Sequence, residues 1–106
     1  MIKTNAQFYN GKAWLRLREA VLRRDGYMCQ IDKRYGKCRK AENVHHIFPR
    51  QEFPEYQYEP WNLISLSHEN HMAMHITSTG ELSPAGIDLL RRTARKNNKP
   101  IPPQYQ

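Results

Sequence analysis

Residues 44–75 read VHHIFPRQEFPEYQYEPWNLISLSHENHMAMH and contain all five histidines of the 106-residue chain. His45 and His46 stand side by side between Val44 and Ile47, a pattern typical of a short β-strand. Because neighbouring side chains of a strand point to opposite faces, one imidazole can face a metal ion while the other faces something else. The stretch therefore predicts a strand that carries two histidines with separate roles.

Two more elements complete this stretch. Prolines recur between residues 48 and 60, so we expect an extended loop there, followed by a second strand over residues 62–66. Ser67 is a suitable N-cap for the helix that we expect next. On that helix His71 and His75 are four residues apart, which stacks their imidazoles on one face and supplies half of a divalent-metal site.

The ordered series of two histidines, one asparagine and two histidines resembles the motif of the HNH endonucleases, and especially the small enzymes of bacteriophages. The segments that carry the resemblance are Trp14–Arg24, Asp25–Gln30, Val44–Pro49 and Asn62–Leu66. The resemblance covers about residues 10–76. It implies an α+β fold, a small single domain in which a ββα-metal core is flanked by an N-terminal and a C-terminal helix.

The resemblance also implies roles for individual residues. His45 and His71 would be metal ligands, and His75 matches a further ligand found in the branch that includes bacterial nuclease toxins. His46 takes the position of the general base, and Asn62 that of the residue that braces the loop and orients this base. Such a division suits phosphodiester cleavage, because a cation neutralises developing charge while a neutral histidine activates water.

We therefore expect a metal-dependent DNA endonuclease of phage or prophage character, which hydrolyses phosphodiester bonds by nicking or by double-strand cutting. An all-imidazole site suits one zinc, nickel, cobalt or manganese ion, and magnesium least. The main alternative is a non-catalytic, metal-stabilised DNA-binding module. A toxin-like nuclease with a cognate inhibitor and a basic structural protein with incidental histidines are further alternatives, and the last leaves the ordered series unexplained.

The composition favours a polyanionic partner. Lysine and arginine number 17 against 10 acidic residues, giving a net charge of +7, and phosphate contacts by basic side chains release counterions and speed encounter. The basic residues that we expect to contact DNA are Arg16, Arg23, Arg24, Arg34, Arg39, Lys40 and Arg50. For those on the first helix, a merely solvated polar face is an equal alternative.

The chain lacks an apolar run of the roughly 20 residues that span a bilayer. We expect a cytoplasmic protein without membrane contact, present as a monomer or weak dimer. The resemblance adds phage packaging proteins to the expected partners.

The segments before the histidines predict one clear helix. Asn10 is a reasonable N-cap for an amphipathic helix over residues 11–24, which Asp25-Gly26 ends. Residues 1–9 show little pattern, so we expect them to pack loosely, and residues 27–43 indicate an irregular region with turns.

The segments after the histidines predict a helix and a tail. Ser83-Pro84 provides N-cap and first-turn signals for a helix over residues 84–97. The proline-rich residues 98–106 indicate a flexible tail.

The two cysteines give little support for a structural zinc ion. Many phage HNH proteins use two Cys-x-x-Cys pairs here, but Cys29 alone keeps its position, with Asp32, Ser67 and Asn70 at the other three. One thiolate of four is not a zinc site. We expect Cys29 and Cys38 to be packing residues.

Overall fold

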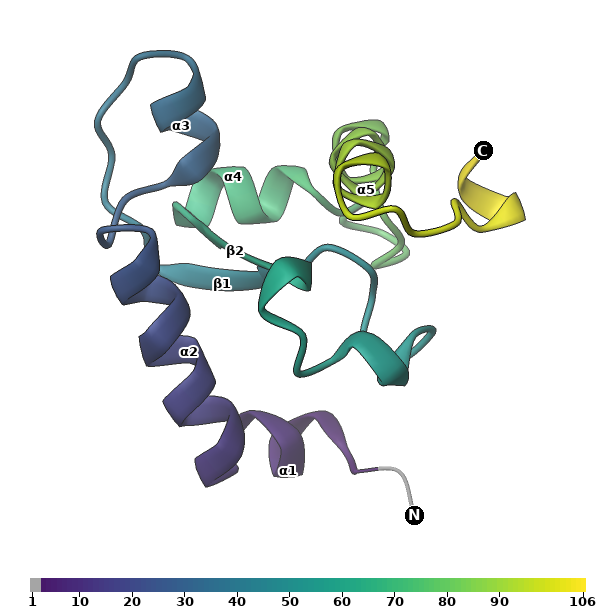
Figure 1. Ribbon diagram of the computed structural model, residues 1–106, viewed down its shortest axis with the longest axis horizontal. Coiled ribbons are helices and arrows are strands. Elements are labelled where there is room, and N and C mark those ends of the chain that lie inside the picture. Colours follow the sequence, from purple (N-terminus) through teal and green to yellow (C-terminus); the bar gives the residue numbers. More distant parts are fainter. Residues whose placement is uncertain (1–2) are drawn as a thin grey trace.

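A computed structural model describes residues 3–106. Its helices and strands are, in chain order, α1 (Asn5–Tyr9), α2 (Lys12–Arg24), α3 (Gln30–Arg34), β1 (Asn43–His46), β2 (Leu63–Leu66), α4 (His68–Ala73) and α5 (Pro84–Lys96), with short 3₁₀ turns at Pro54–Tyr56, Pro60–Asn62 and Pro103–Tyr105. Figure 1 shows the two strands in the middle of the molecule, with α1 and α2 on one side and α5 and the C-terminus on another.

The two strands form an antiparallel pair. His45 lies opposite Ile64, and His46 lies opposite Leu63. Both α2 and α4 pack against this pair, and Ser67 caps α4 by accepting a hydrogen bond from the Asn70 backbone. The expected α+β fold, with two antiparallel strands followed by a helix, is therefore confirmed.

Two apolar clusters hold the strands in place. The first joins α1 and α2 to one side of the pair, and its buried members are Phe8, Trp14, Val21, Leu22, Ala41, Val44 and Leu63. The second joins the loop after β1 to α5, and its buried members include Phe48, Leu66, Leu89 and Leu90. Because the sheet has only two strands, helices and loops supply most of the burial that stabilises it.

The N-terminal segment differs from the expectation of loose packing. Residues 1 and 2 lie outside the described part, but residues 5–9 form α1, capped by reciprocal hydrogen bonds between Thr4 and Gln7. Phe8 anchors this short helix in the first cluster. A second difference is that Gly11, and not Asn10, is the N-cap of α2.

Two other expectations also need correction. The region expected to be irregular contains α3, a single helical stretch over Gln30–Arg34. The segment expected to be a flexible tail packs on the body: Tyr105 is buried, its hydroxyl donates to Glu52 at 2.7 Å, and its carbonyl accepts from Arg91 at 2.6 Å.

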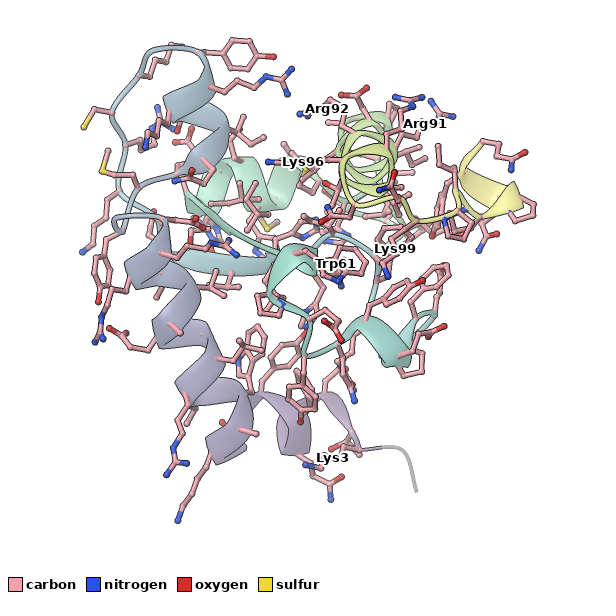
Figure 2. All side chains as sticks on the ribbon, in the orientation of Figure 1. Lys3, Trp61, Arg91, Arg92, Lys96 and Lys99 are labelled. Atoms are coloured by element: carbon pink, nitrogen blue, oxygen red, sulfur yellow. The ribbon has the colours of Figure 1, made fainter. Side chains whose placement is uncertain are left out.

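The aromatic residues of the long loop fold back on the protein. Phe53, Tyr56 and Trp61 surround Phe48 with ring centroids 5.2 to 5.8 Å away. Lys99 lies 5.3 Å from the Trp61 centroid, and Figure 2 labels both side chains. These contacts pin the loop and leave its rings little freedom to stack on bases. No helix in residues 3–106 has the length and apolar composition that crossing a membrane requires.

Candidate metal centre

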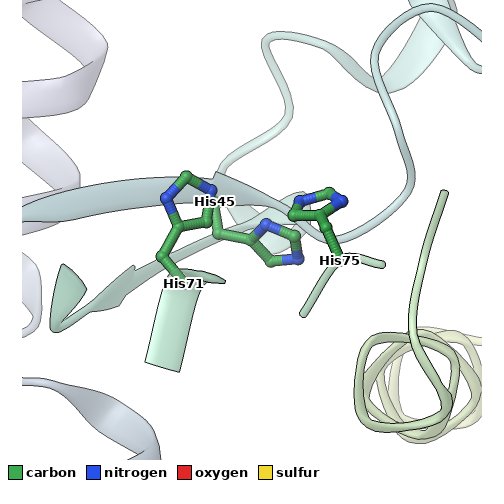
Figure 3. A group of neighbouring side chains, drawn as sticks. All are labelled: His45, His71 and His75. Carbon is green, nitrogen blue, oxygen red and sulfur yellow. The ribbon is translucent and has the colours of Figure 1, made fainter. Parts of the chain in front are cut away.

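Three imidazoles from separate parts of the fold meet beside the strand pair (Figure 3). His45 comes from β1, His71 from the end of α4, and His75 from the segment just after it. The His45 ring centroid is 5.3 Å from each of the other two, which are 5.7 Å apart. One nitrogen of each ring lies within 4.8 Å of the others, and residues 3–106 hold no second group of this kind.

The chemistry of this cluster fits a cation. His45 is 1% exposed, and its Nε2 has no hydrogen-bond partner among the described residues. Burial lowers the pKa of His45 well below its usual range, and repulsion from the other two imidazoles lowers it further. Burial also lowers the pKa of His71. Imidazoles bind metals in their neutral form. Nitrogens that each lie about 2.1 Å from one ion are at most about 4.2 Å from one another. A small rotation of the side chains would therefore bring the three nitrogens to ligand distance.

The position of His75 differs in detail from the expectation. Helix α4 ends at Ala73, so His75 lies beyond the helix, where it forms an isolated bridge with Leu82. Its Nδ1 is 3.2 Å from the Gly80 carbonyl oxygen. Because a carbonyl can only accept, Nδ1 donates and Nε2 is free to face the other two rings. His68 is exposed at the start of α4 and lies outside the cluster.

His46 has different surroundings on the other side of β1. Its ring stacks on Trp14 at a centroid distance of 5.0 Å and is 7% exposed. Its Nε2 lies 3.0 Å from the Gln57 carbonyl and must donate, so Nδ1 accepts from the Tyr9 hydroxyl at 3.3 Å. Burial lowers the pKa of His46 to about 4. At pH 7 this imidazole is therefore neutral, with its lone pair on Nδ1.

The lowered pKa of His46 predicts that the metal-free protein loses stability in acid. The pKa is about 4 in the folded protein and 6.5 in the unfolded chain. Between these values the unfolded chain binds more protons than the folded protein. Stability that is present above pH 6.5 is therefore lost as the pH falls towards 4. The loss is about 3 kcal/mol from this residue. Urea unfolding of metal-free protein at about pH 7.5 and about pH 4 measures it. Between the same two pH values, the His46→Gln variant should lose less stability than the wild-type protein. An equal loss in both proteins would contradict the lowered pKa of His46.

Asn62 braces the loop that follows β1. Its side chain is fully buried, its Oδ1 accepts from the Phe48 backbone at 2.7 Å, and its Nδ2 donates to the carbonyls of Phe48 and Tyr56 at 3.2 Å each. The Asn62 carbonyl also accepts from the Ile47 backbone at 2.9 Å. These bonds fix the chain directly after His46.

The two kinds of histidine share one cavity. It has a volume of about 690 Å³, and its lining includes His45, His46, His71, His75 and Arg50. A substrate in this cavity could contact both the three-histidine cluster and the separate imidazole. Arg50 is the one member of the expected DNA-contacting set in this lining.

The other expected DNA-contacting residues lie elsewhere, and two of them have structural partners. Arg24 pairs with Asp25 and donates to the carbonyls of Pro60 and Leu63 at 2.9 and 2.7 Å, so it ties α2 to the start of β2. Arg39 pairs with Asp32 and Glu69, and is about half exposed. The remaining four are exposed: Arg16, Arg23, Arg34 and Lys40. Of these, Arg23 makes an exposed ion pair with Glu19 at 3.9 Å.

The sequence did not indicate four other residues of the cavity. Asn5, Tyr9, Arg18 and Asn43 belong to its lining. Asn43 shares the face of β1 with His45, and its Oδ1 has no partner among the described residues. The spacing of Thr4 and Gln7 is that of a capping box, Ser/Thr-x-x-Glu/Gln. This signal could have predicted α1, the helix that carries Asn5 and Tyr9.

The cysteines differ from one another. Cys29 is buried and lies 3.3 Å from the Asn70 side chain, so its expected packing role is confirmed. Cys38 is exposed, so the same expectation was wrong for it. Within the described part of the chain, neither belongs to a metal-binding group.

The chain matches no protein-family model and no curated protein. Among solved structures it is similar to the crystal structure of the HNH endonuclease of the deep-sea thermophilic bacteriophage GVE2 with manganese ion, with 28% sequence identity and a TM-score of 0.62. The similarity covers 88% of this chain and 82% of that one. The expected resemblance to the small phage-type HNH endonucleases is therefore confirmed.

Proposed function

We propose that the chain is a single-domain, metal-dependent HNH-type endonuclease that hydrolyses phosphodiester bonds of DNA, of phage or prophage origin. The similarity to a phage HNH endonuclease supports nuclease activity in general. The observation that carries the finer proposal is the cluster of His45, His71 and His75, with His46 lining the same cavity.

The side chains divide the work of hydrolysis. His45, His71 and His75 would hold a divalent cation, which when bound neutralises phosphate charge and stabilises the departing oxygen. His46 would accept a proton at Nδ1 from a water that takes the place of the Tyr9 hydroxyl, since its Nε2–H donates to the Gln57 carbonyl. The water oxygen bonds to phosphorus while the bond to the 3′ oxygen breaks, and the departing 3′ oxygen takes a proton from solvent. The products carry a 5′-phosphate and a 3′-hydroxyl.

The donor set narrows the choice of ion. Imidazole nitrogens suit zinc, nickel, cobalt and manganese, whereas magnesium prefers oxygen ligands. The similar phage enzyme has a structure with manganese ion. We propose manganese as the first ion to test, and DNA as the substrate. The DNA would be bound by the exposed members of the expected set, Arg16, Arg23, Arg34 and Lys40. We also propose phage packaging proteins as partners of a monomer or weak dimer.

A plasmid assay tests the function. Supercoiled DNA should be converted to nicked or linear DNA with Mn²⁺, Zn²⁺, Ni²⁺ or Co²⁺, less with Mg²⁺, and not at all with a chelator. If no ion supports cutting while DNA binding persists and chelation unfolds the protein, the chain is the metal-stabilised binding module instead.

A pair of variants on α4 tests the metal centre. His71→Ala removes a proposed ligand and should weaken Mn²⁺ affinity at least about tenfold, equivalent to about 1.4 kcal/mol, in calorimetric titration. His68→Ala is the matched control, because this exposed imidazole lies outside the cluster and should leave affinity unchanged. Equal losses in both variants would contradict the proposed ligand set.

A further inference from the structure

The side chain of Arg50 is buried without a counter-charge. It is 7% exposed, and its Nε has no hydrogen-bond partner among the described residues. The ion pairs in residues 3–106 use Arg23, Arg24, Arg39 and Arg92, and none of them uses Arg50. Burying a charge away from water is costly unless an opposite charge or hydrogen bonds compensate for it. The described residues therefore leave the Arg50 charge without an ion-pair partner and its Nε without an acceptor.

Helix α1 holds this guanidinium at the cavity. Asn5 accepts a hydrogen bond from Nη2 of Arg50. The guanidinium carbon lies 4.4 Å from the centroid of the Phe8 ring and 5.7 Å from that of Tyr9, both within the range of cation–π attraction. Three residues of α1 thus fix the direction of this cation, while its buried Nε remains without a hydrogen-bond partner among the described residues.

We propose that Arg50 binds a phosphate of the nucleic-acid strand inside the histidine cavity, with Asn5 and Phe8 as its positioning residues. The inference rests on the proposed function, because the same cavity is lined by His45, His46, His71 and His75. The planar guanidinium has several N–H donors in a fork that fits two oxygens of one phosphate. Arg16, Arg23 and Arg34, which are exposed, supply general attraction to DNA, whereas Arg50 sets where one phosphate lies.

Binding of a fluorescent 12-base-pair DNA in the presence of a chelator tests this without cleavage. Arg50→Met keeps an unbranched stem over Phe8 but removes the charge, and it should raise the Kd at least about tenfold and reduce the slope of log Kd against log salt by about one. Arg50→Lys keeps the charge without the fork and should give a smaller rise. In ¹⁵N NMR spectra the Arg50 Nε–H signal should shift on adding the DNA, and less on adding inorganic phosphate.

Arg95→Met is the matched control, since it removes one positive charge from an exposed position on α5 outside the cavity lining. Its Kd should stay within about twofold of wild type. A folded Arg50→Met variant with wild-type Kd and salt slope, but lower thermal stability, would show that Arg50 only clamps α1 and would overturn the proposal. If Arg50→Met does not fold, the Arg50→Lys variant takes its place. A wild-type Kd in Arg50→Lys, together with an Nε–H signal that does not shift in the wild-type protein, would also overturn the proposal.

The outcomes separate this proposal from the proposed function. A wild-type protein that binds DNA through Arg50 but cuts with no ion would refute the nuclease and support the phosphate site. If the wild-type protein cuts DNA and Arg50→Met binds and cuts it as well as the wild type does, only the phosphate site is refuted. A wild-type protein that binds no DNA would overturn both.

Discussion

Replacing His46 with Ala is expected to reduce plasmid cleavage by about 10²- to 10⁴-fold, the usual contribution of a general base, while Mn²⁺ affinity stays within about twofold of wild type. The reason is the division of β1 into two faces. His45 points to the three-histidine cluster, whereas His46 stacks on Trp14 and donates to Gln57. Removing the second imidazole should therefore remove the proposed proton acceptor and leave the proposed ligands intact.

His46→Ala must be compared with two other variants. His45→Ala should lose metal affinity as well as cleavage, and His68→Ala should lose neither. Circular dichroism and thermal unfolding check that the variants are folded, because His46 also packs in the first apolar cluster through Trp14. If His46→Ala loses the metal and His45→Ala keeps it, the roles of the two neighbours are exchanged.

The sequence predicted the elements whose signals are local. Alternation in a strand places adjacent histidines on opposite faces, and the structure has His45 and His46 in different surroundings. Ser67 and Ser83 both cap helices as expected, each accepting a hydrogen bond from a backbone amide three residues later. The spacing of His71 and His75 was sufficient to bring their rings together although the helix ends between them.

Features that depend on distant partners were missed. Helix α1 is too short to be stable by itself, and it is fixed by Phe8 packing against Trp14 and Tyr58. The tail is ordered by Tyr105, whose partner Glu52 lies far away in the sequence. A pattern read along the chain contains no information about such contacts, because hydrophobic periodicity needs several turns to be recognised.

The candidate site shows the same limit. The histidines were recognisable by order and spacing, but the sequence grouped Arg50 with exposed arginines because all of them contribute equally to net charge. Only the fold distinguishes a buried guanidinium beside the cavity from a solvated one. Arg24 is the opposite case, since its charge suggested DNA and its hydrogen bonds to Pro60 and Leu63 indicate a structural role.

Asn62→Ala is expected to lower the free energy of unfolding by about 3 kcal/mol or more. The change removes three hydrogen bonds, two of them buried and one partly buried. It leaves the Phe48 amide and the carbonyls of Phe48 and Tyr56 to find other partners, at about 1–3 kcal/mol for each buried group left unsatisfied. Urea denaturation at pH 7.5 measures the loss. Asn10→Ala is the matched control, because this exposed amide should change stability by no more than about 0.5 kcal/mol.

Cleavage by Asn62→Ala should fall as well, and the comparison with stability identifies the reason. Phe48 is two residues after His46, so releasing its backbone from Asn62 loosens the segment that aims the imidazole into the cavity. Because the effect is on position, the variant should lose cleavage at temperatures where it is still fully folded, while keeping Mn²⁺ affinity close to wild type. A variant that is destabilised but cuts at the wild-type rate when folded would show that Asn62 only stabilises the loop. A variant that also loses the metal would place the strain at His45 instead.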